Sequence, residues 1–200
     1  MTRPAILVLA AGRATRMRGR DKLMEEVAGQ PLLAERVATA RATGAPVWVT
    51  LPPRAERPGR WAALEGAGAG LIEVGDADNG MSASLRAGLA ALPADCPALL
   101  VMLADMPEIT TADITALLAP FDGTTILRGA SAEGRPGHPV LFPARDFPAL
   151  AALTGDAGAR DLLRAEAGRV RLVPLPARHA LTDLDTPEDW AAWRAARPRG

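Results

Sequence analysis

The chain has 200 residues and a mass of 20.9 kDa; 48% of its residues are hydrophobic and 23% are charged, and 23 basic and 23 acidic side chains give a formal net charge of +0. This balance provides no global attraction to nucleic acid or to an anionic membrane, and a single cysteine, Cys96, excludes an internal disulfide and a multi-cysteine metal site. Six apolar residues after the first four are too few for a signal peptide, and no apolar run approaches about 20 residues, so we expect one soluble, cytoplasmic domain covering residues 1–200.

Apolar runs alternate with stretches of helical character through the first two thirds of the chain. Residues 5–10 are continuously apolar, which is typical of a strand covered on both faces. This alternation predicts an α/β fold, a three-layer sandwich with a mostly parallel, Rossmann-like central sheet. The predicted strands are residues 5–10, 46–51, 71–74, 98–103 and 125–127, and the predicted helices are residues 31–42, 61–65, 81–92 and 111–118.

The last third of the chain predicts a strand at residues 138–142, a helix at 158–167 and a strand at 170–175. A final helix is expected to begin near Pro187, with Thr186 as its cap. Trp190 and Trp193 are spaced to share one side of that helix, which favours a role in the core over a binding platform.

The segment that follows the first strand is rich in small residues and arginine. Ligands of open α/β sheets bind beyond the carboxyl ends of the strands, so this segment is a candidate binding loop. After Leu9, the small residues Ala10, Ala11 and Gly12 allow the backbone to approach an anion and to present N–H groups to it. The composition fits a phosphate cradle, and equally a solvated turn.

Two cations in the same loop, Arg16 and Lys22, are candidates to contact that anion. Lys22 is the only lysine, because the other twenty-two of the 23 basic residues are arginine. Its compact ammonium is a mobile point charge, whereas arginine is a planar fork, and a point charge suits a phosphate chain that changes shape during a reaction. Chance retention of a surface lysine is the alternative.

Polar side chains also cluster where the helix at 81–92 begins. Asp78, Asn79, Ser82 and Ser84 offer oxygens and an amide that can bond to a ribose or a base. Helix capping explains Ser82 without any ligand.

Two distant aspartates are candidate metal ligands. Asp105 stands at the end of the strand at 98–103, and Thr110 or Thr111 is available to cap the next helix in its place. Asp185 is predicted to share a face with Asp183 near the final helix, whose positive end it could instead stabilise. Magnesium prefers one or two carboxylates together with phosphate oxygens, so Asp105 and Asp185 would suffice for Mg²⁺.

A fifth polar segment surrounds His138, which either positions a substrate or is a buried structural histidine. Arg160, at a predicted helix start, is free to reach an anion. We list His138 and Arg160 as candidate contacts to a second substrate.

In this order, these segments resemble the nucleotidyltransferases that attach a nucleotide to the molybdenum cofactor, and most closely the cytidylyltransferase branch. That resemblance spans nearly the whole chain and implies a nucleotide-diphospho-sugar transferase-like fold. The segments that carry it are residues 9–22, 80–88 (GMSASLRAG), 103–107 (LADMP), 137–142 (GHPVLF), 155–160 (GDAGAR) and 183–189 (DLDTPED).

The resemblance implies that a terminal phosphate of molybdopterin attacks the α-phosphorus of CTP and that pyrophosphate leaves. Mg²⁺ held by Asp105 and Asp185 would bridge phosphate oxygens, while Arg16 and Lys22 would neutralise the developing charge. Further partners would include a client molybdoenzyme. Alternatives are GMP transfer, transfer to another small phosphorylated acceptor, and a non-catalytic chaperone that inserts the cofactor.

Two positions depart from the branch pattern: Ala14 replaces a serine and Arg18 replaces a glycine. Asp21 followed by Lys22 is similar to the sister branch that transfers GMP. The start of the loop at residues 10–12 and the later motifs are similar to the CTP-using branch, which favours cytidine over guanosine.

Overall fold

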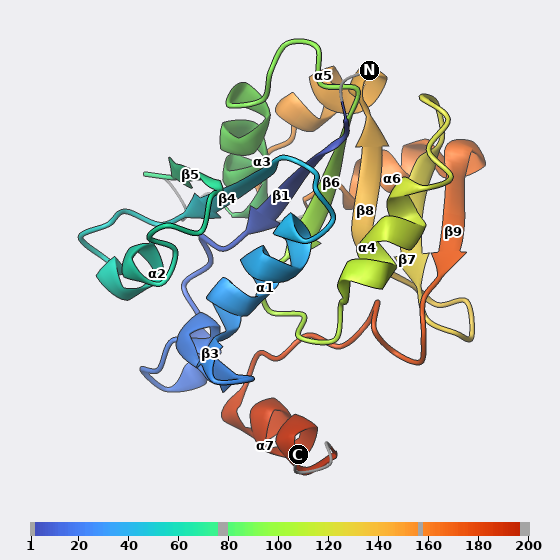
Figure 1. Cartoon of the computed structure of the whole chain (residues 1–200). Coiled ribbons are helices and arrows are strands. Elements are labelled where there is room, and N and C mark those ends of the chain that lie inside the picture. The colour runs from blue at the N-terminus through green and yellow to red at the C-terminus, as the bar shows by residue number, and fades with distance from the viewer. Residues whose placement is uncertain (1–2, 76–79, 156–157, 197–200) are drawn as a thin grey trace.

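The computed structural model describes residues 3–75, 80–155 and 158–196, and within them seven strands form one central sheet (Figure 1). The strands of this sheet are β1 (Ala5–Leu9), β4 (Val47–Leu51), β5 (Gly70–Glu73), β6 (Ala98–Leu103), β7 (Ile126–Ala130), β8 (Pro136–Pro143) and β9 (Val170–Pro174). Their order is β5-β4-β1-β6-β8-β7-β9, and only the pairs that include β8 are antiparallel among these strands. The predicted mostly parallel α/β architecture is confirmed.

Helices cover both faces of the sheet and complete three layers. The helices are α1 (Leu32–Arg41), α2 (Pro58–Ala62), α3 (Met81–Ala90), α4 (Thr111–Leu118), α5 (Phe147–Ala151), α6 (Arg160–Ala165) and α7 (Pro187–Ala196). In Figure 1, α1 and α4 lie in front of the sheet, and α3, α5 and α6 lie behind it. Neighbouring strand residues point to opposite faces, so Ile6 and Val8 pack in the front core and Leu7 packs in the rear core.

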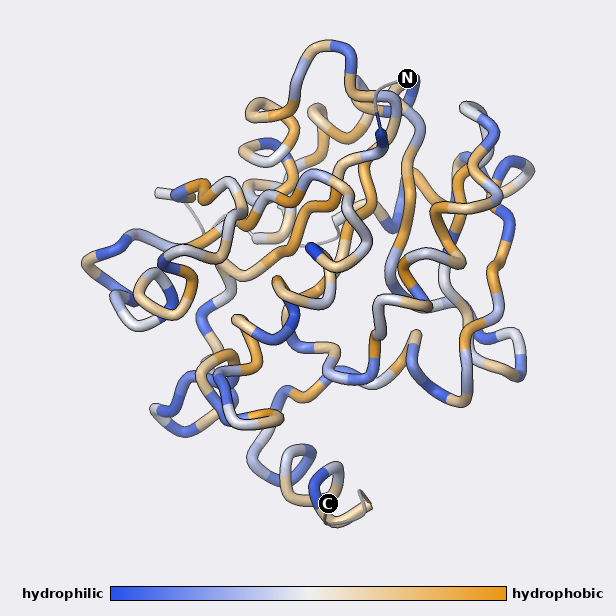
Figure 2. Tube along the Cα trace, viewed as in Figure 1, coloured by the Kyte–Doolittle hydropathy of each residue, from blue (hydrophilic) through white to orange (hydrophobic). Residues whose placement is uncertain are grey.

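Hydropathy follows this layering. In Figure 2 the strands are mostly hydrophobic, and the segment after β1 is largely hydrophilic. Among the described residues, no helix combines the length and apolar character that crossing a membrane requires.

The sequence located most elements to within a few residues but missed the smallest ones. Strands β2 (Glu26–Val27) and β3 (Gln30–Pro31) form a separate antiparallel pair, and helix α5 was also not foreseen. Helix α2 begins at Pro58 instead of residue 61, with the proline in its first turn.

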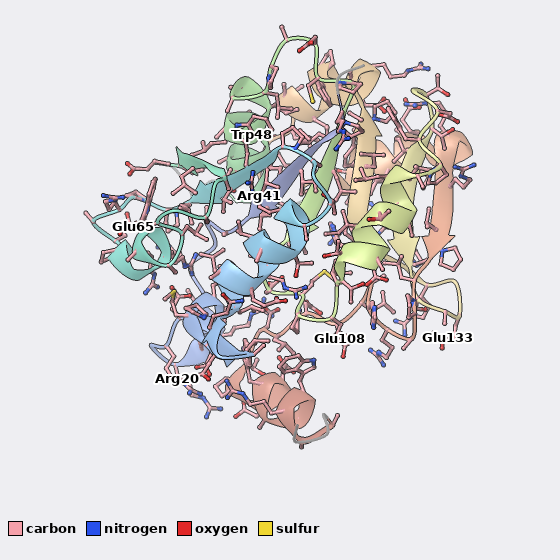
Figure 3. All side chains as sticks on the ribbon, viewed as in Figure 1. Arg20, Arg41, Trp48, Glu65, Glu108 and Glu133 are labelled. Carbon is pink, nitrogen blue, oxygen red and sulfur yellow. The ribbon has the colours of Figure 1, made fainter. Side chains whose placement is uncertain are left out.

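The final helix has the predicted cap and the predicted core residues. The backbone N–H of Asp189 donates to Thr186 Oγ1 at 3.1 Å. Trp190 and Trp193 are buried and form an edge-to-face pair with ring centroids 5.7 Å apart. The Trp193 Nε1–H donates to Glu108, which Figure 3 labels below the sheet on the side of α7.

The chain that leads to α7 is drawn against the end of the sheet by close backbone contacts. A Cβ at Gly137 would lie 1.8 Å from the carbonyl oxygen of Ala180, so only glycine fits there. The N–H of Leu184 donates to the carbonyl oxygen of Asp105 at 3.0 Å. These contacts place residues 181–186 beside the carboxyl end of β6.

Candidate active site

A cleft of about 680 Å³ opens beyond the carboxyl ends of β1 and β6. Four consecutive residues of the predicted binding loop, Leu9, Ala10, Ala11 and Gly12, line it. A Cβ at Gly12 would meet no atom within 4 Å, so this position borders open space. Small side chains here expose the backbone to whatever occupies the cleft.

The loop is anchored at its middle and strained nearby. Met17 is fully buried in the front core, within a short 3₁₀ turn at Thr15–Met17. Ala14 and Arg18, the two positions that depart from the branch pattern, flank this turn with positive φ angles of 56° and 52°. Such backbone favours glycine, which explains why a glycine suits position 18.

Arg60, on α2, holds the loop from beneath, and the sequence analysis did not identify it. Its side chain is 0% exposed and forms a two-pronged ion pair with Asp21, at 2.7 and 2.8 Å. The same guanidinium donates to the carbonyl oxygens of Ala10 and Gly12 at 2.5 and 2.8 Å. A bidentate charged contact of this kind fixes geometry as well as position, so Arg60 sets the shape of the binding loop.

Lys22 lies between the two candidate metal ligands. Its Nζ atom is 2.5 Å from Asp105 Oδ2 and 2.6 Å from Asp185 Oδ1. Arg16 contacts the other oxygen of Asp185 at 2.7 Å and is largely exposed toward the cleft. The structure therefore brings together four side chains that are up to 169 positions apart, as the sequence analysis expected.

Two carboxylates surround the Lys22 ammonium. Burial lowers the pKa of Lys22, but the neighbouring charges of Asp105 and Asp185 and their hydrogen bonds outweigh it, so the pKa lies above 10.5. Burial raises the pKa of Asp183, and the negative charges of Asp105 and Asp185 raise it further. Lys22 is thus a permanent cation among carboxylates.

Asp105 has the unused oxygen that a metal ligand needs. Its Oδ1 atom is buried and has no hydrogen-bond partner among the described residues. An unpaired buried carboxylate oxygen is costly, and a hard divalent cation compensates for that cost. The described residues hold no group of three or more His, Cys, Asp or Glu side chains able to bind a metal.

Ser84 lines the cleft as expected, but Ser82 does not. Ser82 is fully buried, and Arg86 Nη1 donates to its Oγ at 3.3 Å. It is not a cap either, because Gly80 occupies the N-cap position of α3. The prediction that Ser82 contacts a nucleotide is corrected on this ground, and Asp78 and Asn79 lie outside the described residues.

His138 and Arg160 meet at a second, smaller cavity of about 160 Å³. His138 Nδ1 is buried, and burial, followed by the positive charge of Arg128, lowers the pKa of His138 from 6.5 to about 4. The imidazole is therefore neutral at pH 7. Arg128, which the sequence analysis did not select, also lines this cavity, and Met81 lines both cavities.

Comparison with known proteins decides the family. The family model described as the MobA-like NTP transferase domain matches residues 6–170. This chain belongs to that family. Membership confirms the resemblance to molybdopterin nucleotidyltransferases and supports an enzyme that transfers a nucleotidyl group.

Relatives of this MobA-like protein agree with that placement. It is 28% identical over 201 residues to the purine catabolism protein PucB of Bacillus subtilis, a match that covers 94% of each chain. The solved structure of Rv0371c from Mycobacterium tuberculosis superposes with a TM-score of 0.82 at 27% identity, covering 98% of this chain and 99% of that one. A complex of Rv0371c with manganese has a TM-score of 0.79 at 27% identity, and covers 98% of this chain and 100% of that one.

Proposed function

We propose that this protein transfers CMP from CTP to the terminal phosphate of a molybdopterin-type acceptor and releases pyrophosphate. The observation that carries the proposal is the position of Lys22 between Asp105 and Asp185 at the wall of the cleft that the binding loop lines. The motifs that resemble the cytidylyltransferase branch support CTP as the donor.

Each side chain has a defined task in this reaction. The backbone N–H of Ala10 already donates to the carbonyl oxygen of Thr50, so the N–H groups of Ala11 and Gly12 cradle the triphosphate. Arg16 and Lys22 neutralise the charge that develops on pyrophosphate as the bond to the α-phosphorus breaks. Asp105 and Asp185 would hold Mg²⁺, which would supply positive charge to neutralise the phosphate groups. The buried free oxygen of Asp105 supports this assignment, and the manganese complex of Rv0371c shows that a homologue binds a divalent ion.

The chemistry needs no covalent enzyme intermediate. The attacking oxygen belongs to a phosphate monoester, whose second pKa is about 6, so it is already anionic at neutral pH and no side chain has to remove a proton. Cys96 is buried, and burial raises the pKa of its thiol, so it is a poor nucleophile. Positioning and electrostatic stabilisation account for catalysis.

The structure supplies one argument on nucleotide choice. Asp21 followed by Lys22 is the pair that made the loop similar to the GMP-transferring branch. Both of its carboxylate oxygens are engaged by Arg60, and Oδ1 also accepts from the backbone N–H of Leu23 at 3.1 Å. Because both oxygens are already engaged, we assign Asp21 a structural role in the loop rather than contact with a guanine base.

Release of pyrophosphate with each NTP, with and without molybdopterin and Mg²⁺, tests the proposal. Release that depends on both CTP and molybdopterin is the expected result. Release with GTP and not with CTP would instead identify the activity as GMP transfer. Saturable binding of molybdopterin without release of pyrophosphate under any condition would instead favour a chaperone that delivers the cofactor to a molybdoenzyme.

The cytoplasmic location and the single-domain organisation remain predictions.

A further inference from the structure

Arg128 occupies a position in the sheet where an apolar residue is expected. The register of β6, β8 and β7 aligns Val101 with Val140 and Val140 with Arg128, so the three side chains form one row across the sheet. This face carries the rear core, in which Val101 and Val140 are buried. Ile126, two residues before Arg128 on the same face of β7, is also buried there. A charge in this row is unfavourable unless something compensates for it.

The described residues provide no negative charge to compensate Arg128. Its Nε atom donates to the carbonyl oxygen of Gly137 at 2.9 Å, and neither Arg128 nor Arg160 forms an ion pair within the described parts of the chain. Arg128 and Arg160 line the same cavity, and burial, followed by the positive charge of Arg160, lowers the pKa of Arg128. Within the described residues, two cations thus line one cavity without a carboxylate, and a bound anion would compensate their charge.

The lining of the cavity indicates the chemical character of the ligand that carries this anion. Its described lining contains no acidic residue. Neutral His138 adds a polar ring without adding charge, and its Nδ1 lacks a hydrogen-bond partner among the described residues. The remaining side chains are apolar, namely Met81, Leu85, Val101, Val140, Phe142, Ala159 and Leu163.

We infer that this cavity binds an oxyanion of the acceptor substrate, either a phosphate or a carboxylate. The half-buried Arg128 anchors that oxyanion, and the apolar walls contact the adjoining uncharged part of the acceptor. The assignment to the acceptor rests on the proposed transferase function, whereas the anion site itself does not. Met81 lies on the border between this cavity and the main cleft, so an acceptor held here borders the nucleotide site.

Calorimetric titration of the full chain with inorganic phosphate and, separately, with acetate at pH 7.5 tests the anion site. Arg128→Gln and Arg160→Gln should each raise the dissociation constant of the preferred anion, by about tenfold or more for Arg128→Gln, because a charged hydrogen bond is lost. Arg128→Lys should recover part of the affinity. Arg145→Gln, which removes one exposed charge outside both cavities, is the matched control and should stay within about twofold of the wild type.

Preference for phosphate or for acetate identifies which oxyanion the acceptor carries. Arg160 is exposed, so Arg160→Gln decides the question if Arg128→Gln does not fold. The inference is overturned if the wild type binds neither anion, or if no folded variant of the two weakens binding more than Arg145→Gln does. If the protein binds an anion in an Arg128-dependent way but releases no pyrophosphate in the transferase assay, the proposed function is rejected and the anion site is retained. With active enzyme, Arg128→Gln should raise the KM for molybdopterin and leave the KM for CTP unchanged.

Discussion

Lys22 contacts two carboxylates with one ammonium group, at 2.5 and 2.6 Å, in a position that is only 12% exposed. A guanidinium is planar and larger, so it cannot place its charge at the same point. This difference gives a physical reason for a single lysine in a chain whose other basic residues are arginine.

We therefore predict that Lys22→Arg is nearly as damaging as Lys22→Ala. Each should lower kcat for pyrophosphate release by about 10²-fold or more, because a preorganised charge at the transferring phosphate is lost or displaced. Circular dichroism should show an unchanged fold. Arg20→Lys, at an exposed position that pairs with Glu25, is the control and should keep the wild-type rate. A wild-type rate in Lys22→Arg would show that only the sign of the charge matters.

The buried His138 affects the stability of the fold at acid pH. Its pKa is about 4 in the folded chain and near 6.5 when unfolded, so the unfolded state binds more protons between these values and stability falls as the pH decreases through that window. Between pH 7.5 and pH 5, the wild type should lose about 2 kcal/mol more of its unfolding free energy than His138→Gln does. Urea unfolding at the two pH values measures this difference, and equal losses in both proteins would contradict a buried neutral imidazole.

Residue patterns predicted the convergence of Lys22, Asp105 and Asp185, because polar residues that follow parallel strands meet at one edge of a sheet. They did not reveal Arg60, whose partners are backbone carbonyls and a carboxylate 39 positions away. Arg128 did leave a signal, since it interrupts an apolar strand, but that signal becomes interpretable only when the register shows which face it occupies.

At the scale of elements, helix α2 supports the binding loop through a single buried side chain. Arg60 is 0% exposed and Asp21 is 13% exposed, so removal of either partner leaves a poorly solvated charge. The short helix thus holds the loop that lines the cleft through Arg60.

We predict that Arg60→Met lowers the free energy of unfolding by about 3–5 kcal/mol, the usual cost of breaking a buried ion pair from one side. The double variant Arg60→Met with Asp21→Leu should recover part of that loss, because no unpaired charge remains. Urea denaturation gives both values, and exposed Arg41→Met should change stability by less than about 0.5 kcal/mol. Equal losses in the single and double variants would mean that Asp21 is not the partner that matters.

Elements with a clear hydrophobic period were predictable, and very short ones were not. Strands β1 and β6 are continuous apolar runs, whereas β2 and β3 contain two residues each and show no period to detect. Helix α7 was foreseen because Thr186, Pro187 and the tryptophan spacing all indicate the same start and the same buried side.

At the scale of the whole molecule, the site exists because the sheet gathers distant segments at one edge. The loop after β1 supplies Arg16 and Lys22, and the end of β6 supplies Asp105. The segment before α7 supplies Asp185, and the N–H of the preceding Leu184 donates to the carbonyl oxygen of Asp105. No stretch of sequence contains the site by itself, so the site forms only when the chain folds.

The most direct measurement is the Mg²⁺-dependent release of pyrophosphate from CTP and molybdopterin by Asp185→Asn beside Glu188→Gln. Both variants remove one negative charge from the same segment, but Asp185 contacts Lys22 whereas Glu188 forms an exposed pair with Arg18. We predict a fall of about 10²-fold or more in kcat for Asp185→Asn and a change within about twofold for Glu188→Gln. Wild-type turnover by folded Asp185→Asn would contradict the central claim that the two distant carboxylates and the one lysine form a single catalytic centre.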